Sequence, residues 1–143
     1  MENLKLETQI TFNAPKAAVW QGLTDPDVVK KYFFGTMQES AWMEGSPITW
    51  SGEWEGKTYQ DKGTIQEITP GEYVKYSYWS SMSGLEDKPE NYQIVSYKLS
   101  EKDGVTTLYI TQENVKDQAS KEHSESNWQA IFGGLKKLLE EPQ

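Results

Sequence analysis

The sequence of 143 residues contains no cysteine, no arginine and a single histidine, His123. The lack of cysteine excludes disulfide bonds and thiol catalysis, and one histidine cannot form the usual Cys/His site of a transition metal. We therefore expect neither a metal nor another cofactor. We interpret His123 as a solvent-facing helix residue, and the alternative is a ligand contact or pH-sensitive contact at the mouth of a cavity.

All 14 basic residues are lysines, and the formal net charge is −8 at pH 7. Nucleic-acid affinity depends on basic side chains that neutralise phosphates, so an acidic chain repels such a partner. Arginine is also the side chain that pairs with carboxylates and phosphates in bidentate geometry. The sequence therefore predicts no nucleic-acid partner and disfavours a phosphate-rich ligand.

Long hydrophobic runs are also lacking, and none approaches the length that crosses a membrane. Residues 1–7 contain acidic side chains and lack the uninterrupted apolar stretch of a signal peptide. We therefore expect a cytoplasmic protein with no membrane partner. The length suits one domain, residues 1–143, and no internal repeat or linker divides the chain.

The two ends of the chain predict most of the architecture. Residues 4–12 alternate with a period of two, which is typical of a strand with one buried face. A short helix follows, with Asn13 as the expected cap and Pro15 in its first turn. Asp25 and Pro26 begin a second short helix. The last helix is expected to start near Ser120 and to be stopped by Pro142, and its apolar face consists of Trp128, Ile131, Phe132, Leu135, Leu138 and Leu139.

Antiparallel strands are expected between these ends, over residues 48–54, 57–69, 72–80, 95–99 and 108–110. Residue pairs 55–56, 70–71 and 103–104 each contain glycine and are typical of tight turns. The polar segment 81–91 is predicted to be a loop beside an opening. The predicted fold class is α+β, with a curved antiparallel sheet wrapped around the long C-terminal helix and a short helical pair after the first strand.

This order of elements, together with several short segments, resembles the family related to the activator of the heat-shock protein 90 ATPase, within the START-like, helix-grip group. The matching segments are 12–15, 19–20, 23–26, 61–65, Trp128 with Ile131, and 135–140. One departure is Asn127, where relatives often have glycine. The resemblance implies a helix-grip domain over nearly the whole chain.

The functions implied by this resemblance are diverse. The wider group contains carriers of lipids and small molecules, cyclases and hydrolases, and a fold alone does not choose among them. The eukaryotic co-chaperone carries an additional N-terminal domain without a counterpart in this sequence, so the resemblance implies at most a weak chaperone contact. A protein-interaction module is therefore the second hypothesis, and an enzyme of cyclase or hydrolase type is the third.

The abundant aromatic residues predict a ligand site. The chain contains six Trp, eight Tyr and four Phe, whose rings provide apolar walls with hydroxyl and indole donors. Polar residues on the inner side of the last helix, including Ser124, favour a cavity over a filled core. We therefore expect binding of a small hydrophobic or aromatic molecule between sheet and helix. The expected contacts are Tyr32, Phe33, Trp50, Trp54, Asp61, Tyr76, Tyr97, Ser124, Trp128 and Phe132. The alternative is that the aromatic rings simply fill the core.

Asp61 is the candidate for proton chemistry. If residues 59, 61 and 65 point inward, desolvation would favour the protonated form of its carboxyl group. The simpler interpretation is a hydrated or hydrogen-bonded residue near a strand end. No nucleophile elbow or phosphate-binding glycine loop is present, so we assign no catalytic residue and expect binding without catalysis.

Two adjacent glycines, Gly133 and Gly134, interrupt the last helix. Glycine lowers helix propensity by about 1 kcal/mol relative to alanine, so a glycine inside a helix suggests a close contact at that position; the alternative is that both glycines are neutral surface residues. Gly134 is near the border of the apolar face, and we expect a close contact at that position. Gly133 is turned further away and is expected to have no such contact.

Overall fold

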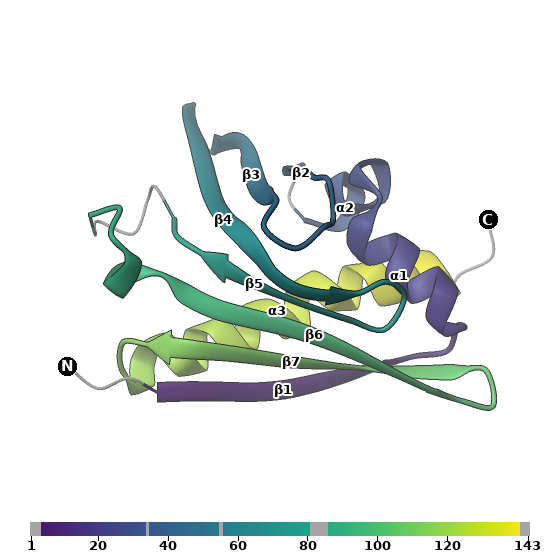
Figure 1. The fold of residues 1–143 in the computed structure, drawn as a ribbon. Coiled ribbons are helices and arrows are strands. Elements are labelled where there is room, and N and C mark those ends of the chain that lie inside the picture. Colours follow the sequence, from purple (N-terminus) through teal and green to yellow (C-terminus); the bar gives the residue numbers. More distant parts are fainter. Residues whose placement is uncertain (1–3, 34, 55, 81–85, 141–143) are drawn as a thin grey trace.

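The structure is a computed structural model, and it describes residues 4–33, 35–54, 56–80 and 86–140. It confirms the α+β fold, in which a curved antiparallel sheet grips a long C-terminal helix (Figure 1). The elements in chain order are β1 (Leu4–Phe12), α1 (Lys16–Thr24), α2 (Pro26–Tyr32), β2 (Met37–Ser40), β3 (Pro47–Trp54), β4 (Lys57–Thr69), β5 (Tyr73–Tyr78), the 3-10 turn η1 (Pro89–Asn91), β6 (Gln93–Lys102), β7 (Val105–Val115) and α3 (Gln118–Glu140).

The sheet has seven strands in the order β1-β7-β6-β5-β4-β3-β2. Consecutive strands from β2 to β7 form a meander, and β1 pairs with β7 at the far edge. The sequence did not predict β2, because this strand has four residues and its buried side chain, Gln38, is polar. The alternation of apolar residues that predicts other strands is therefore absent there.

The expected turn between β6 and β7 is confirmed. Of the turn expected between β3 and β4, Glu55 lies outside the described residues, and the two strands pair as far as Trp54 and Lys57. Lys102 pairs with Val105, so the second hairpin has a loop of two residues. Both loop residues, Asp103 and Gly104, have positive φ angles of 54° and 79°. This conformation is that of the hairpin turn which Asp-Gly favours. Within the expected loop 81–91, residues 81–85 lie outside the described part of the chain, and Pro89–Asn91 form η1.

A bend in β4 gives the sheet its curvature. The first part of β4 pairs with β3, and the last part pairs with β5 (Figure 1). Gly63 lies at the bend, where a Cβ atom would overlap the carbonyl oxygen of Ser77. Only glycine permits so close an approach of two strands. The Ser77 hydroxyl also accepts a hydrogen bond from the Thr64 amide at 3.0 Å.

The starts of two helices differ from the expectation. Asn13 does not cap α1: Pro15 occupies the capping position without a side-chain bond, and the Asn13 amide instead donates to Glu140 Oε2 at 3.0 Å. The last helix begins at Gln118 rather than near Ser120, because Asp117 Oδ1 accepts a hydrogen bond from the Ser120 amide at 2.8 Å. The start of α2 is as expected, since Asp25 caps it through the Asp27 amide.

The core lies between the concave face of the sheet and the C-terminal half of α3. Ile131, Phe132 and Leu135 are buried there. Gly22 of α1 packs so closely against Leu135 that a Cβ at Gly22 would be 2.6 Å from Leu135 Cδ1. No helix within the described ranges is both long enough and apolar enough to cross a membrane.

The outer edge of β1 is covered by side chains of α3. Gln129 Nε2 donates to Thr8 Oγ1 and to the carbonyl oxygen of Gln9, both at 3.0 Å. Lys136 Nζ donates to the carbonyl oxygen of Thr11 at 2.6 Å. Backbone acceptors that an edge strand normally leaves to solvent are therefore occupied.

Candidate functional site: a cavity between the sheet and the C-terminal helix

A cavity of about 570 Å³ lies between the concave sheet and the N-terminal half of α3. Strands β3 to β7 form one wall, α3 forms the other, and the segment after α2 adds a third side. The cavity opens to solvent, since its lining includes exposed residues of α3 and β3. The lining residues are Phe33, Thr36, Trp50, Glu53, Tyr59, Asp61, Tyr76, Tyr78, Gln93, Val95, Gln112, His123, Ser124, Asn127, Trp128 and Ile131.

Six of the residues expected from the sequence are brought together in this lining. They come from five separate parts of the fold: Phe33 follows α2, Trp50 is on β3, Asp61 on β4, Tyr76 on β5, and Ser124 and Trp128 on α3. The curvature of the sheet places these distant segments around one space. His123 also lines the cavity while remaining exposed, so it lies at the rim.

Three other expected residues, Tyr32, Tyr97 and Phe132, are buried behind the cavity lining. The Tyr97 ring meets those of Trp128 and Phe132 edge-on, with centroid distances of 6.0 and 5.7 Å. Trp128 and Phe132 stack with an interplanar angle of 4°. These rings support the cavity wall and fill the core. The side chain of Trp54 lies outside the described part of the chain.

Several polar lining residues, among them Gln93 and Gln112, were missed in the sequence. Gln112 continues the inward alternation of Leu108 and Ile110 on β7, and Gln93 precedes Val95 by two residues on β6. The alternation with a period of two, continued past the apolar positions, indicates that both glutamines face inward. A polar residue at the end of a series of inward-facing apolar residues therefore indicates where the packed core ends and the cavity begins.

Hydrogen bonds hold the indole rings of the two walls in place. Trp128 Nε1 donates to Gln112 Oε1 at 2.8 Å, and Gln112 Nε2 donates to Gln93 Oε1 at 2.6 Å. On the other wall, Trp50 Nε1 donates to Gln38 Oε1, and Gln38 Nε2 donates to the carbonyl oxygen of Leu23, both at 2.8 Å. The indole N–H groups are thus satisfied by protein, and the rings offer apolar surface.

A polar region lies beside the Trp50 ring. The Tyr78 hydroxyl donates to Asp61 Oδ2 at 2.8 Å, and the hydroxyls of Thr36 and Tyr59 are 2.5 Å apart. Burial, and then the charge of Asp61, raise the pKa of Tyr78 far above its ordinary value. Tyr78 is therefore a neutral hydrogen-bond donor at physiological pH.

Two buried tyrosines are paired at the cavity wall: Tyr76 lines the cavity, and Tyr97 lies behind it. The hydroxyls of Tyr76 and Tyr97 are 2.7 Å apart, and burial raises the pKa of each well above its ordinary value. Both phenols therefore stay protonated and serve as hydrogen-bonding groups rather than as bases. The described residues contain no group of three or more His, Asp or Glu side chains placed to hold a metal ion. The chemistry that this arrangement supports is binding through aromatic faces and a few polar contacts.

Comparisons with known proteins place this geometry in a family. The model of the family described as "Activator of Hsp90 ATPase homolog 1-like protein" matches residues 13–140. No curated protein matched the chain.

Among solved structures, ChR145 from Cytophaga hutchinsonii is 41% identical, with a TM-score of 0.84 over 98% of this chain and 97% of that one. The Aha1 dimer from Colwellia psychrerythraea is 20% identical, with a TM-score of 0.74 over 96% of each chain. PFC0360w, an HSP90 activator from Plasmodium falciparum, is 18% identical, with a TM-score of 0.74 over 97% of this chain and 98% of that one. The last two structures show a shared fold. Because the family model matches residues 13–140, the chain belongs to the family of proteins like activator of Hsp90 ATPase homolog 1.

Proposed function

We propose that this protein binds a small hydrophobic or aromatic molecule in the cavity, without catalysing a reaction. The observation that carries the proposal is the cavity itself, about 570 Å³ in volume and walled by Trp50, Tyr76 and Trp128. Ligand sites usually occupy about 300–1,000 Å³ and combine aromatic walls with a few polar groups. Protein interiors are otherwise packed densely, so an open space of this size between sheet and helix needs an explanation.

The polar lining residues support the same proposal. Ser124, Asn127 and Gln112 line a space that a fully packed core would fill with apolar side chains. Gln112 is bonded to Trp128 and Gln93, whereas the Ser124 hydroxyl and the Asn127 amide face a space that water or a ligand can occupy. The Asp61 carboxylate, which accepts the one proton of the Tyr78 phenol, adds an acceptor that orients a bound molecule.

Ligand binding predicts a rise in melting temperature and a change in tryptophan emission when apolar and aromatic compounds are screened. A ligand at about 100 times its dissociation constant adds roughly 2.7 kcal/mol to the free energy of unfolding. A Ser124→Phe variant introduces a bulky ring into the cavity and should weaken both responses. Ser126→Phe makes the same change at an exposed position of α3 and should keep them. Equal responses from the two variants, or none from the natural chain across a broad library, would contradict the proposal.

A second candidate function is contact with a chaperone of the heat-shock protein 90 type. Its support is the family description and the fold shared with the Plasmodium falciparum activator. We expect this contact to be weak at physiological salt. Affinity capture of a purified heat-shock protein 90, with a salt wash, measures it. Retention of the chaperone together with an increase in its ATPase rate would make this candidate the main function.

A further inference from the structure

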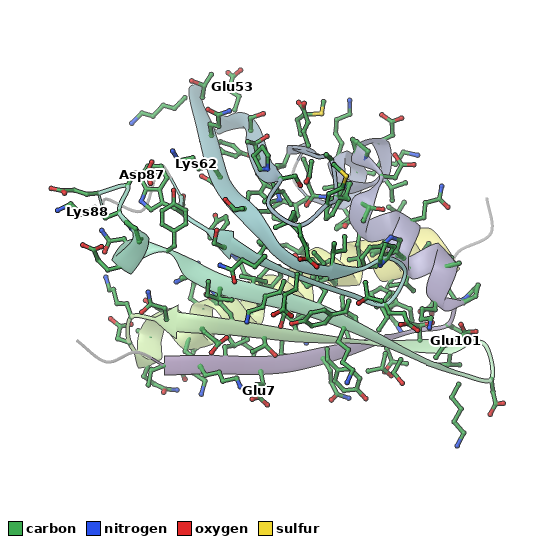
Figure 2. The ribbon with its side chains drawn as sticks, viewed as in Figure 1. Glu7, Glu53, Lys62, Asp87, Lys88 and Glu101 are labelled. Carbon is green, nitrogen blue, oxygen red and sulfur yellow. The ribbon has the colours of Figure 1, made fainter. Side chains whose placement is uncertain are left out.

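The charges around the cavity narrow the class of ligand, an inference that rests on the proposed function. Two carboxylates, Asp61 and Glu53, line the cavity, and no lysine does so among the described residues. Glu53 is exposed near the end of the β3–β4 hairpin (Figure 2). His123 is the lining side chain that can become positively charged, and it is at the rim.

Asp61 is the carboxylate placed deeper in the site. It is on the inward face of β4, directly opposite Trp50 on β3, and it is half-buried. The bond from the Tyr78 hydroxyl holds its Oδ2 atom against the aromatic wall. A charge in this position is screened by salt less than a charge on the surface.

The lysine nearest in sequence is turned to the other face of the sheet. Lys62 follows Asp61 on β4, and its ammonium group forms an ion pair with Asp87 (Figure 2). The same group lies 5.8 Å from the centroid of the Trp79 ring. Neither Lys62 nor Trp79 lines the cavity.

We propose that the cavity prefers a planar aromatic molecule carrying a cationic nitrogen, with Asp61 as the opposite charge and Trp50 and Trp128 as the walls. A cation near the face of a tryptophan ring is attracted by the ring quadrupole, and the attraction grows when water is excluded. An anionic ligand would bring a like charge close to Asp61, which disfavours its binding. Fatty acids and other carboxylates are therefore poor ligands of this site.

Three probes of similar shape test this preference: 9-aminoacridine as the cation, anthracene-9-methanol as the neutral compound and anthracene-9-carboxylate as the anion. Dissociation constants come from quenching of tryptophan emission, at about pH 8 so that an ordinary histidine is neutral. We expect the cation to bind at least about tenfold more tightly than the anion. Equal affinities for the three probes would overturn the inference and leave the proposed function intact. A lack of binding by all three, and by a broad library, would overturn both.

Two variants distinguish the effect of the Asp61 charge from the effect of the protein's overall negative charge. Asp61→Asn removes the charge and keeps an oxygen that can accept the Tyr78 hydrogen bond, so the preference for the cation should fall to within about threefold. Glu67→Gln removes the same charge from an exposed position on β4 outside the lining and should leave the preference unchanged. Equal loss in both variants, or none in Asp61→Asn, would overturn the assignment to Asp61. Circular dichroism of each variant verifies that it is folded.

Discussion

Gly133 and Gly134 are adjacent in α3 but have different surroundings. A Cβ at Gly134 would lie 3.1 Å from Tyr32 Cβ, whereas a Cβ at Gly133 would meet nothing within 4 Å. Tyr32 is buried, and its hydroxyl donates to the carbonyl oxygen of Gly22 at 2.8 Å. The contact at Gly134 is therefore with a part of Tyr32 that is held close to the backbone and has little freedom to shift.

We expect Gly134→Ala to destabilise the protein by about 1–3 kcal/mol, because the added methyl group overpacks the contact between α3 and α2. Gly133→Ala should stabilise it by up to about 1 kcal/mol through helix propensity alone. Urea unfolding of both variants measures the difference, and each serves as the control for the other. Equal stabilisation by the two substitutions would show that Gly134 marks no close contact.

At the scale of the element, the sequence predicted every strand that carries an apolar alternation. The alternation along β1 and the Asp103-Gly104 turn were sufficient because each depends on local backbone geometry. β2 was missed because its buried residue, Gln38, is stabilised by partners from β3 and α1. Those partners exist only after folding. α3 begins at Gln118, slightly before the expected position near Ser120, because Asp117 caps the helix.

The candidate site shows the same division between local and non-local information. Trp50, Tyr76 and Trp128 were predicted because large aromatic residues on inward faces are visible in sequence. The sequence could not separate the rings that line the cavity from those that lie behind it, such as Tyr97. That separation depends on the bend of β4 at Gly63 and on the path of α3 across the sheet. Both are consequences of packing between distant segments.

At the scale of the whole molecule, Glu140 at the end of α3 joins this helix to the residue that follows β1. Its carboxylate accepts the Asn13 amide at 3.0 Å and pairs with Lys136 at 3.0 Å. These bonds, the Asn13 amide first, hold the pKa of Glu140 below its ordinary value. Because the pKa of Glu140 is lower in the folded state than in the unfolded state, the ionised carboxylate stabilises the fold at pH values above its unfolded-state pKa. This stabilisation is lost as the pH falls through the folded-state pKa.

We therefore expect Glu140→Gln to lower the urea midpoint at about pH 7 and to have a smaller effect near pH 3, where the natural carboxylate is also protonated. Glu122→Gln, at an exposed position of the same helix, is the control and should change the midpoint little. Urea titrations of the three proteins at several pH values give the comparison. A constant difference between Glu140→Gln and the natural chain from neutral to acidic pH would contradict a role for the ionised carboxylate.

The covered edge of β1 limits how copies of this protein can associate through their sheets. Gln129 and Lys136 occupy the carbonyl groups of Gln9 and Thr11 that an incoming strand would need. Sheet extension is thus disfavoured at β1, and the opposite edge, β2, has only four residues. A fibre requires each copy to offer two different free edges, whereas pairing between two β2 strands ends with a closed dimer. The contacts between α3 and β1 therefore act against open-ended polymerisation of the folded protein.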